Sequence, residues 1–318
     1  MCLSVRDNRG VTTACTFDSL TKYYGEQLGV EDVTFAVEPG EVFGFLGANG
    51  AGKTTAMRVL MGLLQPTRGN ATIFGEDATA HGPRLRADVG YLPGALALYG
   101  DLTARAHLEF LAHMRGRDCK RTMSALATRL DLDLTRRVRD LSKGNQQKVA
   151  LVAAFMHEPR LLVLDEPTSG LDPLVQREFE GMLHEACGRG AAVLLSSHVL
   201  SEVEHQAHRV GVLHRGHLVH ISPMADLRAK ARRSLEFEFD ARPDVEALRA
   251  VPGVLDASAH DGIVTCMVRG DERDLLREAV RQGVRTVRTH EQSLEDVFFE
   301  IIDGGAAHAE RAHPQDAA

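Results

Sequence analysis

A glycine-rich stretch at residues 47–54 constrains this chain more than any other feature of its sequence. Its letters fit the spacing G-x-x-x-x-G-K-[ST], which is typical of a loop that binds phosphate groups. An apolar stretch of buried-strand type, residues 42–46, precedes the loop, and apolar residues recur at helical spacing over residues 55–63. Strand, glycine-rich loop and helix are the context that such a loop needs, so we predict an α/β fold organised around a phosphate site.

The residues of this loop are suited to hold a nucleoside triphosphate. Glycines let the backbone curl so that successive N–H groups point inward, and the helix that follows adds free N–H groups and the positive end of its dipole. We expect Lys53 to reach the β- and γ-phosphates and the Thr54 hydroxyl to ligate Mg²⁺. The predicted nucleotide-binding residues of this segment are Gly47, Ala48, Asn49, Gly50, Ala51, Gly52, Lys53, Thr54 and Thr55.

Composition narrows the class of protein. With 318 residues, 44% of them hydrophobic and 25% charged, the chain is long enough for two domains and has the make-up of a globular protein. Its net charge of −7 argues against a general nucleic-acid binder. The five cysteines form no C-x-x-C pair, and no apolar run approaches the roughly 20 residues that cross a bilayer. We therefore expect a protein of the reducing cytosol that reaches a membrane only through a partner.

The pattern of apolar residues, turns and charges divides the chain into five parts, the second of which contains an insertion. They are a disordered leader (1–13), a strand-rich α/β domain (14–222) with a helical insertion (about 95–140), a charged linker (223–233), a small α+β unit (234–303) and a disordered tail (304–318). The small unit shows the element order βαββαβ followed by a helix over residues 293–302, which suggests a ferredoxin-like fold.

Two carboxylates end an apolar strand well downstream of the loop. The run Leu-Leu-Val-Leu at residues 161–164 leads directly into Asp165 and Glu166. A strand-end aspartate at this place in a phosphate-loop fold holds the metal, so we predict Mg²⁺ binding by Asp165 and Thr54. We expect Glu166 to act as the general base that takes a proton from the attacking water. A lone Asp-Glu pair would more simply be a solvated turn; the buried strand and the upstream loop favour the catalytic interpretation.

A histidine follows the next apolar strand. Residues 191–196 are typical of a buried strand, and His198 stands at its carboxyl end. One of 15 histidines at a strand end would carry no meaning by itself. Its order after the two carboxylates predicts that it hydrogen-bonds the γ-phosphate and holds the attacking water.

A second segment with anion-binding character lies between the loop and the carboxylates. Residues 141–148 open a helix, and Ser142 and Gly144 just before it offer a hydroxyl group, a backbone N–H and the helix dipole to an anion. The chain already has one phosphate loop. A second anion site is most economical if it closes over the nucleotide of another copy, so we predict a dimer with shared sites.

Together these motifs resemble those of the ATP-binding subunit of ABC transporters, over about residues 14–222. The similar segments are Walker A (47–54), Walker B with its catalytic glutamate (161–166), the D-loop (169–172), the switch histidine (His198), the family signature in a variant form (141–145) and the aromatic residue that stacks on adenine (Tyr24). Residues 293–298 are similar to a helix in the small C-terminal domain of the exporter-type subfamily.

The resemblance implies an ATPase that uses ATP and Mg²⁺ to power a membrane exporter. Two copies, identical or paralogous, would enclose two ATP molecules, each held by Walker A of one copy and by Ser142 and Gly144 of the other. A separately encoded transmembrane permease would dock on the helical stretch 95–140 and keep this subunit on the cytoplasmic face of the membrane. The resemblance implies no nucleic-acid partner, and the transported substrate stays open among drugs, lipids and polysaccharides.

Two departures from the family pattern matter. Lys143 and Asn145 stand where the signature usually has Gly and Gln, although Ser142 and Gly144 are kept. Gly94 stands where the family places a glutamine that contacts Mg²⁺ and the attacking water. A glycine has no side chain to ligate a metal. Either another group substitutes, or Mg²⁺ keeps an extra water, or the coupling to the permease differs.

Two other kinds of protein share the phosphate loop. A soluble ABC protein that acts on ribosomes or DNA usually carries two cassettes in one chain or long coiled-coil insertions. This sequence has one cassette, no sustained heptads and a negative net charge. A kinase or GTPase has no use for residues 141–148 or for the D-loop. The exporter ATPase is therefore the prediction, and the ribosome- or DNA-directed protein is the alternative.

Overall fold

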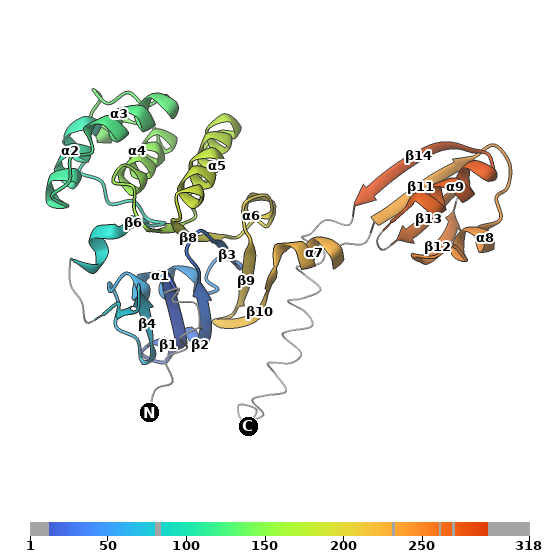
Figure 1. The fold of residues 1–318 in the computed structure, drawn as a ribbon, viewed down its shortest axis with the longest axis horizontal. Coiled ribbons are helices and arrows are strands. Elements are labelled where there is room, and N and C mark those ends of the chain that lie inside the picture. The colour runs from blue at the N-terminus through green and yellow to red at the C-terminus, as the bar shows by residue number, and fades with distance from the viewer. Residues whose placement is uncertain (1–12, 80–83, 231–232, 261, 269–270, 292–318) are drawn as a thin grey trace. The chain divides into compact units, whose positions relative to one another are not determined.

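The computed structural model describes residues 13–79, 84–230, 233–260, 262–268 and 271–291 (Figure 1). The expected leader and tail, and the helix expected over residues 293–302, lie outside this part of the chain or at its margin. The chain divides into two compact units, with the boundary between Ile221 and Ser222. Each unit is described by itself.

The described part of the first unit is organised on a ten-stranded mixed sheet with the strand order β5-β4-β1-β2-β10-β9-β3-β8-β7-β6. The strands are β1 Cys15–Tyr24, β2 Gln27–Val37, β3 Val42–Leu46, β4 Arg68–Ile73, β5 Glu76–Asp77, β6 Val89–Leu92, β7 Leu161–Asp165, β8 Ala192–Ser197, β9 Arg209–His214 and β10 His217–Pro223. β1 pairs antiparallel with β2 and β4, whereas β3, β7 and β8 pair in parallel. β3, β7 and β8 are buried along their whole length, which explains their continuous apolar runs.

Helices begin where the sequence supplies caps. The helices of the first unit are α1 Lys53–Leu60, α2 Ala104–Met114, α3 Lys120–Arg129, α4 Lys143–Phe155, α5 Pro173–Gly188 and α6 Ser201–Glu204, with 3₁₀ turns η1 Leu85–Asp88 and η2 Val138–Asp140. The side chains of Thr103, Ser142 and Asp172 each accept a backbone N–H of the first turn of α2, α4 and α5. Figure 1 shows α2, α3, α4 and α5 gathered at one end of this unit.

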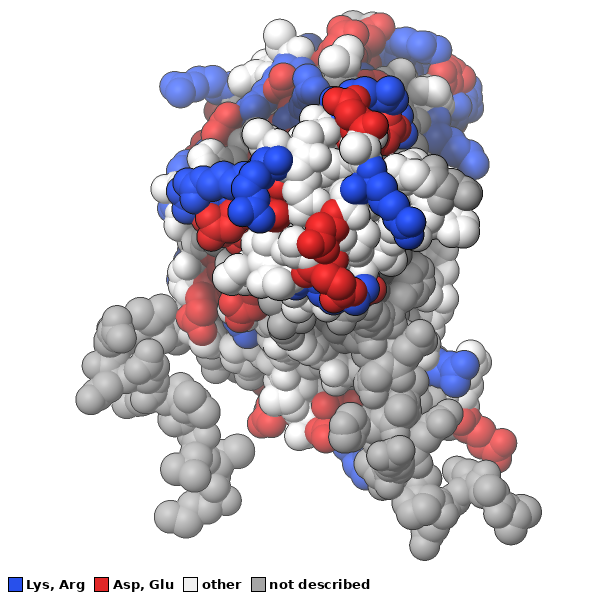
Figure 2. Space-filling model, turned by 90° about the vertical axis from the view of Figure 1, so that its right-hand side faces the viewer, with Lys and Arg blue, Asp and Glu red and all other residues white. Residues whose placement is uncertain are grey.

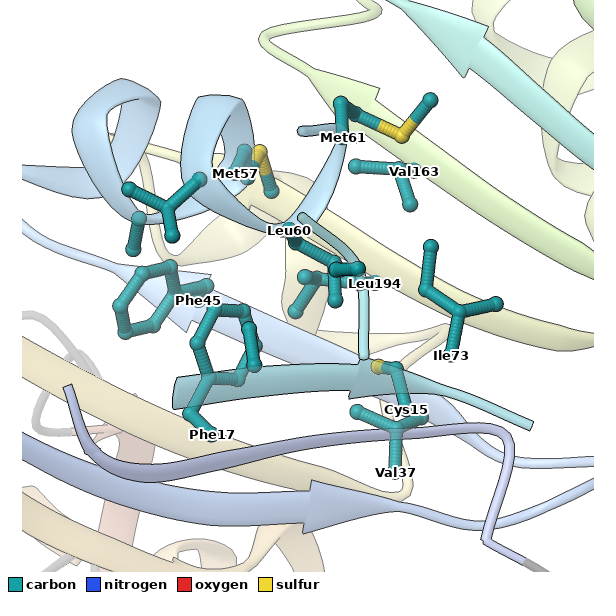
Figure 3. Close-up of a cluster of buried hydrophobic side chains, with 14 of the residues drawn as sticks. Cys15, Phe17, Val37, Phe45, Met57, Leu60, Met61, Ile73, Val163 and Leu194 are labelled. Atoms are coloured by element: carbon teal, nitrogen blue, oxygen red, sulfur yellow. The ribbon is translucent and has the colours of Figure 1, made fainter. Parts of the chain in front are cut away.

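Apolar side chains between α1 and the sheet fix the start of α1. Met57 and Leu60 of α1 are completely buried and face Phe17, Phe45 and Leu194 from three different strands (Figure 3). Burying such large side chains is the main source of stability in a protein core. Because α1 cannot slide on this surface, the loop that ends at its first residue is held in one place.

The second unit contains a four-stranded antiparallel sheet in the order β12-β13-β11-β14. Its elements are β11 Arg233–Phe239, α8 Val245–Arg249, β12 Val254–His260, β13 Ile263–Val268, α9 Arg273–Arg281 and β14 Val284–Glu291. Leu248 of α8 and Leu275 of α9 join Phe237, Val264 and Ala257 in one core, so both helices cover the same face of the sheet. This is the βαββαβ order that the sequence predicts.

The stretch expected to be a charged linker contains a helix. β10 extends to Pro223, and α7 spans Met224–Lys230. Met224 and Leu227, spaced three residues apart on one side of α7, are both buried. The charged residues of this segment therefore alternate with two apolar residues, which form the buried face of a helix.

Charges of opposite sign lie next to one another on the surface of the second unit. Asp271 pairs with Arg273, and on α9 Arg277 lies 2.7 Å from Asp274 and Arg281 lies 2.8 Å from Glu278. Figure 2 shows acidic and basic side chains interspersed on one face of the molecule. Exposed pairs of this kind contribute little to stability.

Candidate active site

The loop between β3 and α1 has its curled shape because glycine stands where no side chain fits. A Cβ on Gly47 would lie 2.3 Å from the carbonyl oxygen of Leu213. Gly52 has a φ of 110°, and a Cβ there would lie 2.3 Å from the carbonyl oxygen of Gly29. α1 starts at Lys53, directly after this turn. Loop and helix start therefore form a concave surface lined by backbone N–H groups, which is suited to an anion.

Lys53 folds back over the loop. Its side chain is 6% exposed, and its Nζ donates hydrogen bonds to the carbonyl oxygens of Gly47 at 2.6 Å and Ala48 at 3.3 Å. The same Nζ lies 3.3 Å from Glu166 Oε1. The positive charge is thus held at the centre of the loop, with the Glu166 carboxylate as its counter-ion.

Asp165, the last residue of β7, is 0% exposed and has both carboxylate oxygens engaged. Thr54 Oγ1 donates to Oδ2 at 2.7 Å, and Ser196 Oγ donates to Oδ1 at 2.6 Å. Hydroxyl and carboxylate oxygens are the ligands that Mg²⁺ prefers, so Thr54 and Asp165 together fit this ion by the chemistry of their donor atoms.

Glu166 is placed by an unusual backbone. Its φ of 51° lies in the left-handed region, which residues other than glycine seldom adopt. Its N–H donates to Ser196 Oγ at 3.1 Å. Its Oε2 lies 2.8 Å from Nδ1 of His198, the residue that follows β8. The carboxylate therefore stands between the ammonium group of Lys53 and an imidazole.

Gly94 packs directly against Asp165. A Cβ at position 94 would lie 2.9 Å from Oδ2 and 3.2 Å from Cγ of Asp165. That carboxylate is held in place by Thr54 and Ser196, so it cannot give way without losing a hydrogen bond. The close approach gives a physical reason for glycine at this position: a Cβ there fits only if the Asp165 carboxylate or the local backbone shifts.

A pocket of about 210 Å³ lies over the loop and is bordered by an exposed tyrosine ring. Its lining residues are Tyr24, Gln27, Leu28, Gly29, Ala48, Asn49, Gly50, Ala51, Gly52, Lys53, Thr54, Thr55 and Glu166. Tyr24 is 44% exposed, and its hydroxyl lies 3.3 Å from Thr55 Oγ1. An exposed aromatic face beside a phosphate-type loop is suited to stack on a flat ring.

Ser142 and Gly144 do not line this pocket. Ser142 caps α4 by accepting the Asn145 N–H at 3.3 Å. A Cβ on Gly144 would lie 2.8 Å from the carbonyl oxygen of Gly170. Gln147, one turn into α4, donates from Nε2 to the Pro167 carbonyl oxygen at 2.9 Å. The start of α4 is thus joined to the turn that follows Glu166, while the two residues predicted to contact a nucleotide stand apart from the loop of their own chain.

Ser196 is the residue of this site that the sequence prediction missed. Its hydroxyl contacts both Asp165 and Glu166. The signal was a polar residue at the end of an otherwise apolar strand, two positions before His198. Loop, buried cation, hydroxyl–carboxylate pair and strand-end glutamate together define a member of the phosphate-loop class of nucleotide hydrolases.

Comparison with known proteins identifies the family within this class. A family model described as ABC transporter matches residues 30–169. The bacitracin transport ATP-binding protein BcrA of Bacillus licheniformis is 34% identical over 303 residues, which are 93% of this chain and 99% of that protein. The BcrA of Enterococcus faecalis is 35% identical over 295 residues, 91% of this chain and 96% of that protein. The chain therefore belongs to the ATP-binding subunits of ABC transporters, a family of ATPases.

Solved structures agree with this assignment. A structure described as the ATP-binding subunit of an ABC transporter superposes with a TM-score of 0.65 at 34% identity, covering 68% of this chain and 92% of that one. The ATP-binding cassette MJ0796, solved as a dimer in a post-hydrolysis state with ADP and Pi, gives a TM-score of 0.61 at 21% identity over 66% of this chain and 98% of that one, which shows the common fold. In the described residues, no helix has both the length and the apolar character needed to span a membrane.

Proposed function

We propose that this chain is the ATP-hydrolysing subunit that powers an ABC-type exporter. The observation that carries the proposal is the position of the Glu166 carboxylate. It stands 3.3 Å from Lys53 Nζ and 2.8 Å from His198 Nδ1, beside the Thr54–Asp165 pair and over the phosphate-type loop. A carboxylate in this place is suited to take a proton from water that attacks a bound γ-phosphate.

Each side chain then has a role that its contacts support. The loop N–H groups and Lys53 hold the triphosphate, and Tyr24 stacks on the adenine ring. Thr54 and Asp165 hold Mg²⁺, which neutralises phosphate charge when it is bound. Glu166 removes the proton from the attacking water. His198 contacts Glu166 at 2.8 Å and orients that carboxylate and the γ-phosphate.

Ser142 and Gly144 act on the nucleotide of a second copy. Both stand at the start of α4, where helix N–H groups and the dipole favour an anion, and neither lines the pocket of its own chain. A dimer in which each ATP lies between the loop of one copy and the α4 start of the other gives both residues a ligand. The related cassette MJ0796, solved as a dimer, supports this arrangement through its common fold.

A membrane partner docks on the helical stretch 95–140 and holds the subunit at the cytoplasmic face of the membrane. Three large apolar side chains of this stretch are exposed: Tyr99, Phe110 and Met114. The Tyr99 and Phe110 rings contact each other edge to face, with centroids 5.4 Å apart. A cluster of this kind is unusual on a free surface and fits an apolar segment of a permease. Relatives named for bacitracin transport and a probable multidrug transporter of Escherichia coli favour drug-like molecules as the cargo.

Replacing the glutamate by its amide tests this function. We expect Glu166→Gln to bind ATP with Mg²⁺ as the parent does, because the loop and Lys53 are unchanged. ATP turnover should fall by about 10²- to 10⁴-fold, since the amide cannot accept the proton. Steady-state phosphate release and nucleotide affinity are the measurements, with size-exclusion chromatography to detect a dimer that persists when ATP is not hydrolysed.

Glu158→Gln is a matched control. Glu158 also has a left-handed backbone, with a φ of 50°, but it is exposed at the end of α4. Its substitution should leave turnover unchanged. Normal turnover in Glu166→Gln would remove Glu166 from the role of general base and, with it, the observation on which the proposal depends.

A further inference from the structure

The hydroxyl group of Ser196 contacts both strand-end carboxylate residues, Asp165 and Glu166. It lies in β8 directly opposite Asp165 of β7 in the parallel register and is 0% exposed. Its Oγ is 2.6 Å from Asp165 Oδ1 and 3.1 Å from the Glu166 nitrogen. No other side chain joins these two residues among the hydrogen bonds of the described part of the chain.

The chemistry of the groups fixes the direction of both bonds. A carboxylate can only accept, and a backbone N–H can only donate. The single Ser196 hydrogen therefore goes to Asp165, and an oxygen lone pair of the same hydroxyl receives the Glu166 N–H. The two hydrogen bonds strengthen each other, because a hydroxyl that donates to a charged group is a better acceptor. Alanine at this place would leave a buried N–H and a buried carboxylate oxygen without these partners.

The bond to the Glu166 N–H acts on a strained segment. Glu166 has a φ of 51°, a conformation that a glutamate keeps only where its surroundings hold it. This backbone aims the side chain at Lys53 and His198. If the N–H were released, the peptide could relax and carry the carboxylate away from both.

We propose that Ser196 is a positioning residue of the hydrolysis reaction: its hydroxyl holds the Asp165 carboxylate and the left-handed Glu166 backbone in one fixed relation. The proposal rests on the proposed function, in which Asp165 holds Mg²⁺ and Glu166 is the general base. Ser196 does not line the pocket over the loop. It therefore affects the rate of the chemical step rather than the binding of ATP.

The experiment compares Ser196→Ala, Ser196→Thr and Ser197→Ala in the full chain. Ser197 is the matched control, since it is the next residue of β8 and is also buried. Its hydroxyl likewise donates to a carboxylate, Glu202 at 2.5 Å, and accepts a backbone N–H, that of Val199 at 3.0 Å. It differs from Ser196 in having its side-chain bonds outside the site.

We expect kcat to fall by about 10- to 100-fold in Ser196→Ala, because displacing a reacting group by about 1 Å has an effect of this size. KM and the affinity for a non-hydrolysable ATP analogue should stay within about threefold of the parent values. Ser196→Thr keeps the hydroxyl and should recover most of the rate. Ser197→Ala should keep the parent kcat. Hydrogen exchange, measured without nucleotide on a peptide that contains Glu166, should be faster in Ser196→Ala than in the parent and the control.

Three results would overturn the proposal. They are an unchanged kcat in Ser196→Ala, an equal loss in Ser197→Ala, and an unchanged exchange rate at Glu166. A parent protein that binds ATP without hydrolysing it would instead contradict the proposed function, and the exchange measurement would still test whether Ser196 holds the Glu166 backbone. Melting temperatures of all variants distinguish a lost rate from lost folding.

Discussion

The two sheets of this chain use their charged residues in different ways. In the first unit, Asp165 lies in the core at the end of β7 with both oxygens bonded to hydroxyl groups. In the second unit, Asp271 meets Arg273 at the surface. Strand direction explains why polar groups gather at one place in the first unit. β3, β7 and β8 run parallel, so the loop after β3, Asp165 and Ser196 all arrive at one edge. Antiparallel strands end alternately at opposite edges, which spreads their terminal residues apart.

This comparison shows how the ends of parallel strands add side chains to a site that the glycine-rich loop begins. In open α/β sheets, ligands bind beyond the carboxyl ends of parallel strands. Here two polar residues at each of two neighbouring strand ends, Asp165 with Glu166 and Ser196 with His198, form one set of hydrogen-bonded groups beside Lys53. The second unit instead forms ion pairs in which at least one of the two described side chains is exposed, as for Arg277 with Asp274 and Arg285 with Glu238. It therefore has the composition of a charged surface rather than of a catalytic centre.

Lowering the pH should produce the largest difference between the two units, in the pH dependence of their free energies of unfolding. His157 of the first unit is buried, with Nε2 3.2 Å from the Val89 carbonyl oxygen, and burial together with the nearby Arg115 charge lowers its pKa from 6.5 to about 4. The unfolded imidazole binds a proton below pH 6.5, whereas the folded one resists until about pH 4. The free energy of unfolding should therefore fall by about 3 kcal/mol as the pH drops through this window.

Thermal unfolding between pH 7 and pH 4 measures this loss, with His157→Gln as the comparison. The variant should show a clearly shallower dependence on pH. Asp271 should not contribute in the same window, because hydrogen bonds from Arg273 lower the pKa of Asp271 to about 2 and its stabilising effect is lost only as the pH falls from about 3.8 toward that value. An identical pH dependence in His157→Gln and the parent would contradict the assignment.

An added methyl group beside Asp165 should have the next largest effect. In Gly94→Ala, the new Cβ would lie 2.9 Å from Asp165 Oδ2 and push the carboxylate out of its hydrogen bonds. We expect ATP turnover to fall by about tenfold, since sub-ångström displacements of a reacting constellation have effects of this order. The Mg²⁺ concentration that gives half-maximal turnover should rise at the same time.

Gly188→Ala is the control for this substitution. Gly188 ends α5, and a Cβ there meets nothing within 4 Å. Its substitution should leave turnover unchanged. If Gly94→Ala had the parent rate and the parent Mg²⁺ dependence, the close approach of Gly94 to Asp165 would have no effect on ATP hydrolysis.

Removing a surface pair of the second unit should have the smallest effect. Arg273→Ala breaks the contact with Asp271, but both side chains are exposed, so solvent replaces the lost interaction. We expect no measurable change in ATP turnover or melting temperature at pH 7. A clear loss of turnover in Arg273→Ala would break the contrast between the units and give the second unit a part in the reaction.

The sequence predicts those parts of the molecule that depend on local rules. The glycine spacing of residues 47–54, the helix that begins just after Ser142, and the βαββαβ order of the second unit all follow from residues close together in the chain. Residues 161–166 are equally clear, because an apolar run that ends in two carboxylates is visible in any window of that length.

The remaining features depend on which strands become neighbours. Ser196 reaches Asp165 only because β8 lies beside β7 in a register that places these two residues opposite each other. Gly94 lies beside Asp165 because β6 pairs in parallel with β7, so that the residues after the two strands meet at the same end of the sheet. Glu166 has a left-handed backbone, and its N–H donates to Ser196 Oγ at the end of a neighbouring strand. Hydrophobic pattern and propensity carry no information on such long-range pairings.

The two contacts at the start of α4 form a short mechanical linkage. Gly144 lies so near the Gly170 carbonyl group that a Cβ would meet its oxygen at 2.8 Å, and Gln147 is hydrogen-bonded to Pro167, the residue directly after Glu166. A displacement of α4 must therefore move residues 167–170. Because Pro167 directly follows Glu166, one hydrogen bond and one peptide bond connect α4 to the proposed general base.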